Sequence, residues 1–188
     1  MAQIKLNATL GLEGSLPAIS GANLTSLNAS NISSGTLNSA RFSGGKILQI
    51  KHFSTEVAAS STSSSYADTN LACTITPTSA SNILLVEITQ NGCAVSGSQF
   101  ASLKIRLLRD STILVDPVSG DVGYRHPGTD QNRVGSSGFV YKDTTHNSTS
   151  AITYKTQIKA DSGYGTVSVQ TGSAYHSSML IMEVASAW

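Results

Sequence analysis

Charged side chains are scarce in this chain of 188 residues, of which they make up only 12%. An average globular domain carries about 25%. The net charge is +1, and no two Lys or Arg residues are adjacent. Nucleic acids and anionic membrane surfaces are bound by concentrated positive charge, so we expect neither as a partner. A surface built from Ser, Thr, Asn and Gly suits contact between protein subunits. The alternative is a merely neutral soluble domain.

Long apolar runs are also missing. No stretch approaches the roughly 20 residues that a membrane-spanning helix needs. The opening residues, MAQIKLNATLGLEG, lack the continuous apolar core of a secretion signal. We therefore expect no membrane segment and no leader peptide.

Cysteines and catalytic patterns are few. Cys73 and Cys93 belong to no CxxC pair and to no Cys/His metal spacing. Both fall in expected strands, which favours buried free thiols and leaves a disulfide open. The four histidines stand alone, and neither an H-E-x-x-H nor a G-x-S-x-G pattern occurs. We therefore expect no metal, no cofactor, no catalytic residue and no enzymatic activity.

The stretch LPAISGANLTSLNASNISSGTLNSARF, residues 16–42, spaces its large apolar residues singly among small polar ones. Their spacing fits neither a helix nor a strand. It repeats in units of roughly eight residues, namely LPAISGAN, LTSLNASN and ISSGTLNS. One such chain cannot bury its apolar residues alone, whereas two or three copies around an axis can. The stretch predicts an extended oligomerisation stem, and a flexible linker is the alternative. The residues expected to mediate oligomerisation or attachment are Leu16, Ile19, Leu24, Leu27, Ile32, Leu37 and Phe42.

From residue 46 to residue 188 the chain predicts one all-β domain, preceded by the stem at 1–45. Apolar alternation between turn signals indicates eight or nine strands, and no amphipathic helical window appears. This number of strands favours an antiparallel sandwich with a jelly-roll topology. The last strand is apolar on both faces, so its outer face should lie under a loop or, as we favour, against another subunit. The expected strands are 46–53, 65–77, 82–95, 100–110, 112–116, 138–143, 151–160, 164–170 and 178–185.

A long loop is expected at residues 117–137. Loops of this length in small domains are commonly functional. This one contains Tyr124, Arg125, His126 and Arg133, and Tyr and Arg are enriched at binding hot spots. It is the candidate surface for recognition. The alternative is a solvated crossover loop of the jelly roll.

Two parts of the chain resemble virion proteins of tailed bacteriophages. Residues 16–42 resemble fibre-type repeats that often read L-P-x-(V/I)-x-G-x-x-L-T-x-L-N-A-S-N-(I/L)-x-S-G-T-(L/V)-x-x-A-R. The stretch KILQIKHFSTEVAASSTSSSYADTNLACTITPTSASNILLVEITQNG and the closing SSMLIMEVA resemble a module that recurs in phage structural proteins. Together these segments cover 83 of the 188 residues. Because such proteins are typically homotrimers, the resemblance implies a trimeric fibre-repeat stem with a β-sandwich head.

The resemblance implies a non-enzymatic virion structural protein that is assembled in the host cytoplasm. We expect a homotrimeric capsid decoration protein, of the cement or head-fibre type, whose N-terminal stem attaches to the major capsid protein. The first alternative is a short tail fibre, joined to a tail component, whose β head binds a host receptor. Tail fibres usually carry a sizeable N-terminal adaptor, whereas only about 15 residues precede the repeats here. The second alternative is a carbohydrate-binding β-sandwich, which would need exposed aromatics, and aromatic residues are 6% of this chain.

Overall fold

The computed structural model describes residues 46–96, 102–116, 133–160, 165–172 and 174–186. Within these ranges every regular element is a β-strand. The predicted stem at 1–45, and with it the boundary at residue 46, lies outside the described residues. The strands are β1 (Ile47–Thr55), β2 (Ala59–Ser61), β3 (Ala67–Ile75), β4 (Ile83–Ser96), β5 (Leu103–Arg109), β6 (Thr112–Val115), β7 (Arg133–Asp143), β8 (Ile152–Ala160), β9 (Thr166–Val169) and β10 (Ser177–Val184).

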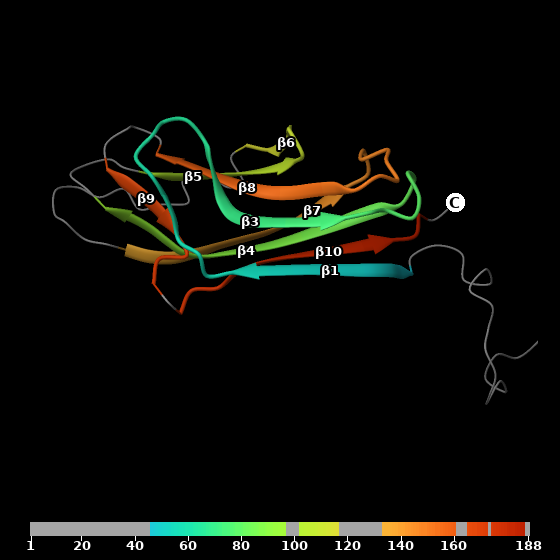
Figure 1. The fold of residues 1–188 in the computed structure, drawn as a ribbon, viewed down its shortest axis with the longest axis horizontal. Helices are drawn as coiled ribbons and strands as arrows, with labels where there is room; N and C mark the ends of the chain where they lie inside the picture. Colours follow the sequence, from blue (N-terminus) through green and yellow to red (C-terminus); the bar gives the residue numbers. More distant parts are fainter. Residues whose placement is uncertain (1–45, 97–101, 117–132, 161–164, 173, 187–188) are drawn as a thin grey trace, which may run out of the picture. The chain divides into compact units, whose positions relative to one another are not determined.

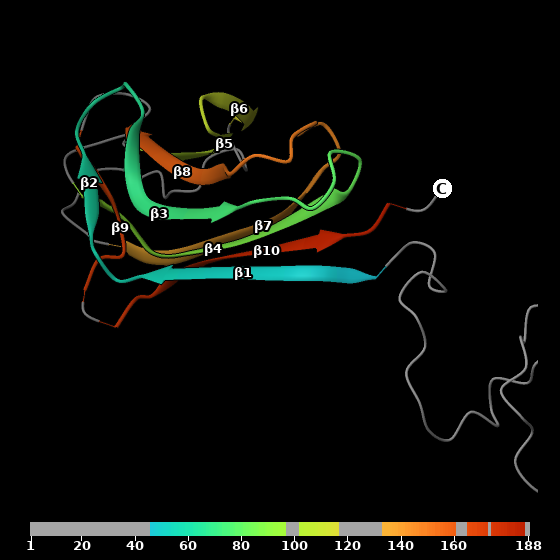
Figure 2. The same ribbon diagram turned by 45° about the vertical axis from the view of Figure 1, so that its right-hand side comes forward.

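The strands form two antiparallel sheets that face each other (Figure 1). One layer has the order β3-β8-β5-β6, and the other has β1-β10-β4 with β7 on the far edge of β4. In this order the first and last strands are neighbours, and the chain crosses repeatedly between layers, as in a jelly roll. The short strands β9 and β2 extend the second sheet at one end, as the turned view shows (Figure 2). The expected antiparallel jelly-roll sandwich is confirmed.

Strict alternation along the strands builds the core. On β8, every second residue from Ile152 to Ala160 is buried, and the residues between them are half-buried. The buried positions are Ile152, Tyr154, Thr156, Ile158 and Ala160. The same pattern on β4 buries Leu84, Val86 and Ile88, and on β5 it buries Leu103, Ile105 and Leu107. Successive side chains of a strand point to opposite faces, so each strand contributes every second residue to the interior. Each large aliphatic side chain fully buried in this way stabilises the fold by about 1.5–3 kcal/mol.

Buried polar side chains lie between two apolar clusters of the core. The larger cluster contains Leu71, Cys73, Ile75, Leu84, Val86, Ile88, Leu107, Ile152, Tyr154, Met179 and Ile181. The smaller cluster contains Cys93, Val95, Leu103, Ile105, Ile158, Ala160, Val167 and Val169. Thr156 on β8 donates a hydrogen bond to Gln90 Oε1 on β4 at 3.0 Å, and its hydroxyl also bonds that of Thr69. Gln90 Nε2 donates to Ser177 Oγ at 3.0 Å, and Ser177 Oγ accepts the backbone N–H of Asn91 at 2.9 Å. Each of these four polar side chains has a hydrogen-bond partner, so burying them costs little free energy. Their hydrogen bonds help to fix the register of the strands that carry them.

Gly92 is the point at which β4 changes partners. Before it, β4 pairs with β10 through residues 83–89, and after it with β9 through residues 94–96. Gly92 has φ +61°, and a Cβ there would lie 2.6 Å from the backbone nitrogen of Thr171. Glycine fits this position because it has no Cβ to clash with Thr171 and because it accepts a left-handed backbone without strain.

Two details differ from the sequence prediction. Strand β7 begins at Arg133, five residues earlier than expected, and the short β2 was not predicted. The added part of β7 reads RVGSS and contains one β-branched residue, so local propensity does not mark it as a strand. It becomes a strand because it pairs with β4 from Val95 to Gln90. Residues 133–137 of the predicted loop therefore belong to β7, and residues 117–132 lie outside the described ranges.

Candidate functional site

The outer surface of the larger sheet carries an unusual number of apolar side chains. Cross-strand pairing places Ile50, Met182 and Leu85 in one row. The next row holds Leu180 and Val140 together with His52 and Glu87. Directly paired residues lie on the same face of a sheet, about 5 Å apart at Cβ. We name this surface the apolar face and define it by Ile47, Ile50, Ile83, Leu85, Val140, Leu180, Met182 and Val184.

Exposure confirms that the apolar face meets solvent in a single copy of the chain. Val140 is 63% exposed, and Ile47 and Ile50 are each 54% exposed. The β10 residues Leu180, Met182 and Val184 are half-buried, although β10 is flanked by β1 and β4. The inner residues of β10 are buried, and no other layer of the described part of the chain covers its outer residues Leu180, Met182 and Val184. The expected cover by another subunit stays a prediction.

The outer surface of the smaller sheet has the opposite character. The Arg106 guanidinium lies 4.0 Å from the ring centroid of Tyr66, and Lys159 Nζ lies 4.9 Å from the same point. Arg106 Nε donates to Gln157 Oε1 at 2.8 Å, and Gln157 Nε2 donates to Asp68 Oδ1 at 2.7 Å. We name this surface the polar face and define it by Tyr66, Asp68, Lys104, Arg106, Asp116, Lys155, Gln157 and Lys159.

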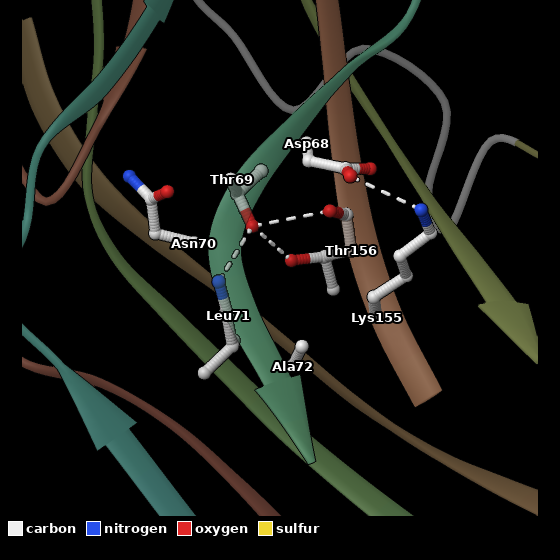
Figure 3. A pocket seen from close by; sticks show the side chains of 7 residues that line it. All are labelled: Asp68, Thr69, Asn70, Leu71, Ala72, Lys155 and Thr156. Atoms are coloured by element: carbon white, nitrogen blue, oxygen red, sulfur yellow. Dashed lines mark hydrogen bonds and ion pairs between the residues drawn. The ribbon is translucent and has the colours of Figure 1, made fainter. Parts of the chain in front are cut away.

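A small open pocket of about 170 Å³ lies beside the polar face (Figure 3). It forms where β3 bulges between Asp68 and Ala72, with Asn70 in the left-handed region at φ 64°. Lys155 Nζ closes one side through an ion pair of 3.0 Å with Asp68. The volume falls below the roughly 300–1,000 Å³ of ligand pockets. The lining residues are Asp68, Thr69, Asn70, Leu71, Ala72, Lys155 and Thr156.

The carboxylate of Asp68 stays ionised in this network. Partial burial works to raise its pKa, but hydrogen bonds from Gln157 and Lys155 outweigh burial, and the net pKa is lowered. A carboxylate with a lowered pKa is a poor proton donor near neutral pH. The chemistry that this surface supports is ion pairing and hydrogen bonding.

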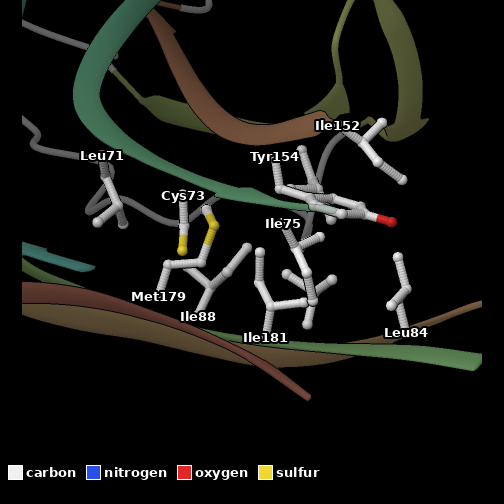
Figure 4. Packing of buried hydrophobic residues seen from close by; sticks show 11 residues of the cluster. Leu71, Cys73, Ile75, Leu84, Ile88, Ile152, Tyr154, Met179 and Ile181 are labelled. Atoms are coloured by element: carbon white, nitrogen blue, oxygen red, sulfur yellow. The ribbon is translucent and has the colours of Figure 1, made fainter. Parts of the chain in front are cut away.

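Two fully buried carboxylates, Asp143 and Glu183, lie in one cross-strand row of the larger sheet. Tyr154, which lies in the larger cluster with its hydroxyl at the cluster's end (Figure 4), donates to Asp143 Oδ2 at 2.6 Å. Arg109 Nη1 lies 2.6 Å from the same oxygen. Glu183 accepts hydrogen bonds from Asn82 and Gln49, both at 2.6 Å, and from the backbone N–H of Thr78 at 2.7 Å.

Both carboxylates are structural anions. Burial tends to raise their pKa, and the hydrogen bonds outweigh it, so the pKa of each is lowered. General acids in glycoside hydrolysis need a raised pKa and contact with substrate. Asp143 and Glu183 meet neither condition, because the pKa of each is lowered and their oxygens accept hydrogen bonds from neighbouring groups of the fold.

The remaining titratable groups of interest are also structural. His146 is buried, and its Nε2 lies 2.8 Å from the backbone oxygen of Asn82. Cys73 and Cys93 are buried free thiols in separate clusters, as the sequence favoured. Burial raises the pKa of Cys93 to about 12. Among the residues that the structure describes, no group of three His, Cys, Asp or Glu could hold a metal ion.

Most sequence-predicted site residues lie outside the described ranges. This holds for the seven stem residues and for Tyr124, Arg125 and His126. Arg133 opens β7, where its backbone pairs with Val95. The loop follows Asp116 directly in sequence, and Asp116 belongs to the polar face. The structure therefore does not test whether these residues form one site.

Sequence reasoning identified the apolar outer side of the last strand, but it did not identify the strands that extend this face or the polar face. The signal for the polar face was present in the outward positions Lys104 and Arg106 and in Lys155, Gln157 and Lys159. These two groups belong to one surface only because β8 pairs with β5, which a single sequence does not show.

Comparison of the sequence with protein-family models and with curated proteins gives no match. Across the described ranges, no helix has the length and apolar character to cross a membrane. The functional interpretation therefore depends on the chain's own residues and on the resemblance of its segments to phage virion proteins.

Proposed function

We propose that the protein is a non-enzymatic structural protein of a bacteriophage virion, a homotrimer that decorates the capsid. Residues 1–45 attach it to the major capsid protein, and the jelly-roll sandwich forms the head. It is of the cement or head-fibre type and is present in the virion after assembly in the host cytoplasm.

The observation that best supports this proposal is the apolar face. Large exposed aliphatic residues in adjacent rows are uncommon on a soluble monomer and mark surfaces that bind other proteins. A structural subunit of a particle needs such a surface. The buried carboxylates are consistent with a structural role, because their oxygens are occupied by donors of the fold.

Immunogold labelling of whole particles tests the placement. Decoration predicts label over the entire head and a copy number in the hundreds, because cement proteins follow the capsid lattice. Label confined to the tail, with tens of copies or fewer, would replace decoration with the tail-fibre alternative. Particles without the protein would contradict both.

The polar face favours a second candidate function, a short tail fibre whose head binds a host receptor. Its cations are held in place by neighbours: Arg106 by Gln157 and the Tyr66 ring, and Lys155 by Asp68. Preorganised Arg and Lys side chains bind anionic groups with little loss of side-chain entropy. The Tyr66 ring is already stacked by Arg106, which weakens the case for a carbohydrate-binding module that stacks sugars on exposed aromatics.

Binding of the labelled full chain to host cells tests this second candidate. If the polar face binds a receptor, R106Q/K155Q should lower cell binding at least about tenfold. The matched control K51Q removes an exposed cation from β1 on the other sheet and should bind as the wild type does. No cell binding by the wild type, or equal binding by R106Q/K155Q, would exclude receptor binding through this face.

A further inference from the structure

We propose that the apolar face is the contact between copies of this chain. The inference rests on the proposed homotrimer and adds to it the surface that joins the heads. Ile50, Leu85 and Met182 would lie at its centre, in one cross-strand row. Val140 and Leu180 lie in the next row, beside Glu87.

The composition of the face resembles that of a protein interface. Its centre is aliphatic, and the row beyond Leu180 is small and polar, formed by Ser54, Ser178, Thr89 and Gly138. Interfaces commonly have an apolar core with a polar rim. The outer side chains of β10 would be fully buried if a second layer covered them, which would match the full burial of its inner side chains.

Charge indicates which partner covers the face. The face carries one carboxylate, Glu87, and one ammonium group, Lys142, with the exposed His52 at its edge. Neither Glu87 nor Lys142 takes part in an ion pair with another described residue, so both are free to pair across an interface. A surface with balanced charges can meet a copy of itself without repulsion.

The polar face could not join copies in the same way. It carries Lys104, Arg106, Lys155 and Lys159 against two carboxylates, Asp68 and Asp116. Two such surfaces would bring like charges together, which costs several kcal/mol when water is excluded. Of the two outer faces, only the apolar one suits contact between identical chains.

The position of the face in the chain supports the same partner. Its edge strand β1 starts at Ile47, immediately after the segment that carries the predicted stem. Chains joined through that segment would hold their heads at a high local concentration, which favours even a modest contact between heads. The competing occupant is residues 1–45 of the same chain, and the test separates the two.

The first test uses the full chain with I50K/V140K. Both positions are more than half exposed in a single copy, so the head should fold with these lysines. The matched control is I113K, which introduces the same charge at a 49%-exposed position on β6 of the other sheet. If the proposal holds, light scattering over a dilution series shows association of I50K/V140K weakened at least about 100-fold, because the lysines would be desolvated together. I113K should associate as the wild type does.

The second test is a charge reversal at Glu87 and Lys142. E87K alone and K142E alone should each weaken association about tenfold, and the double variant E87K/K142E should restore it. This restoration is specific to contact between copies, because the charges of residues 1–45 do not change. Circular dichroism and thermal melting check that each variant folds.

The outcomes separate the inference from the proposed function. A trimeric wild type whose I50K/V140K variant keeps the same association constant overturns the inference and leaves the homotrimer intact. Weakening by I50K/V140K without restoration by E87K/K142E would assign the face to residues 1–45 and would also overturn it. A monomeric wild type contradicts the homotrimer itself.

Discussion

Glu183 and Asp143 show how the fold uses buried charge. Each carboxylate is fully buried and receives several short hydrogen bonds from side chains and backbone of neighbouring elements. Because the folded-state pKa of each lies below its ordinary value, stabilisation is fully present above that value. It is lost as the pH falls through the lower, folded-state pKa. The free energy of unfolding should therefore be independent of these two groups near neutral pH, and it should decrease as they protonate at acidic pH.

E183Q tests this account at a single position. The substitution should lower the free energy of unfolding by about 2 kcal/mol at pH 7, because charge-assisted hydrogen bonds from Asn82 and Gln49 are lost. The difference from wild type should shrink as the pH falls below the ordinary Glu pKa of 4.5, because the glutamate protonates there in the unfolded chain before it does in the folded one. Urea unfolding between pH 7 and pH 3 measures both effects. E87Q, which changes an exposed glutamate of the same sheet, should cost less than about 0.5 kcal/mol. A pH-independent difference for E183Q would contradict the assignment.

At the scale of elements, the sequence predicted the strands whose side chains alternate clearly. The assignments of β5 and β8 were correct because apolar and polar residues alternate along them. The assignment of β4 was correct because Leu84, Val86 and Ile88 place an apolar residue at every second position. The tight turn between β5 and β6 was also correct, and Asp110 there has φ 52°. The first half of β7 was missed because its strand state comes from pairing with β4 rather than from its own residues. The apolar outer side of β10 was predicted, but the full extent of both outer faces could not be, since it depends on which distant strands are neighbours.

A prediction at the scale of elements concerns Gly92, where β4 changes its pairing partner from β10 to β9. G92A should destabilise the sandwich by about 2–3 kcal/mol, because the new methyl group meets backbone atoms and the left-handed φ is strained for alanine. G138A is the control, since its nearest neighbour would be 3.1 Å away, and it should cost less. Chemical denaturation of both variants measures the order. An equal loss of unfolding free energy for the two variants would show that β4 does not depend on glycine at position 92.

At the scale of the whole molecule, the sandwich has two unlike sides. One outer face is aliphatic with balanced charge, and the other is a network of cations, carboxylates and one tyrosine ring. A soluble monomer would not need this difference, whereas a subunit of an assembly would bury the first face and present the second. The predicted stem and the loop residues Tyr124, Arg125 and His126 stay predictions, because they lie outside the described residues.

The solution mass of the full chain, measured by light scattering across a dilution series, tests the central proposal most directly. A homotrimer predicts three times 19.5 kDa at micromolar concentration. A mass of 19.5 kDa at every concentration would contradict the homotrimer, and with it the assignment of the apolar face to contact between copies.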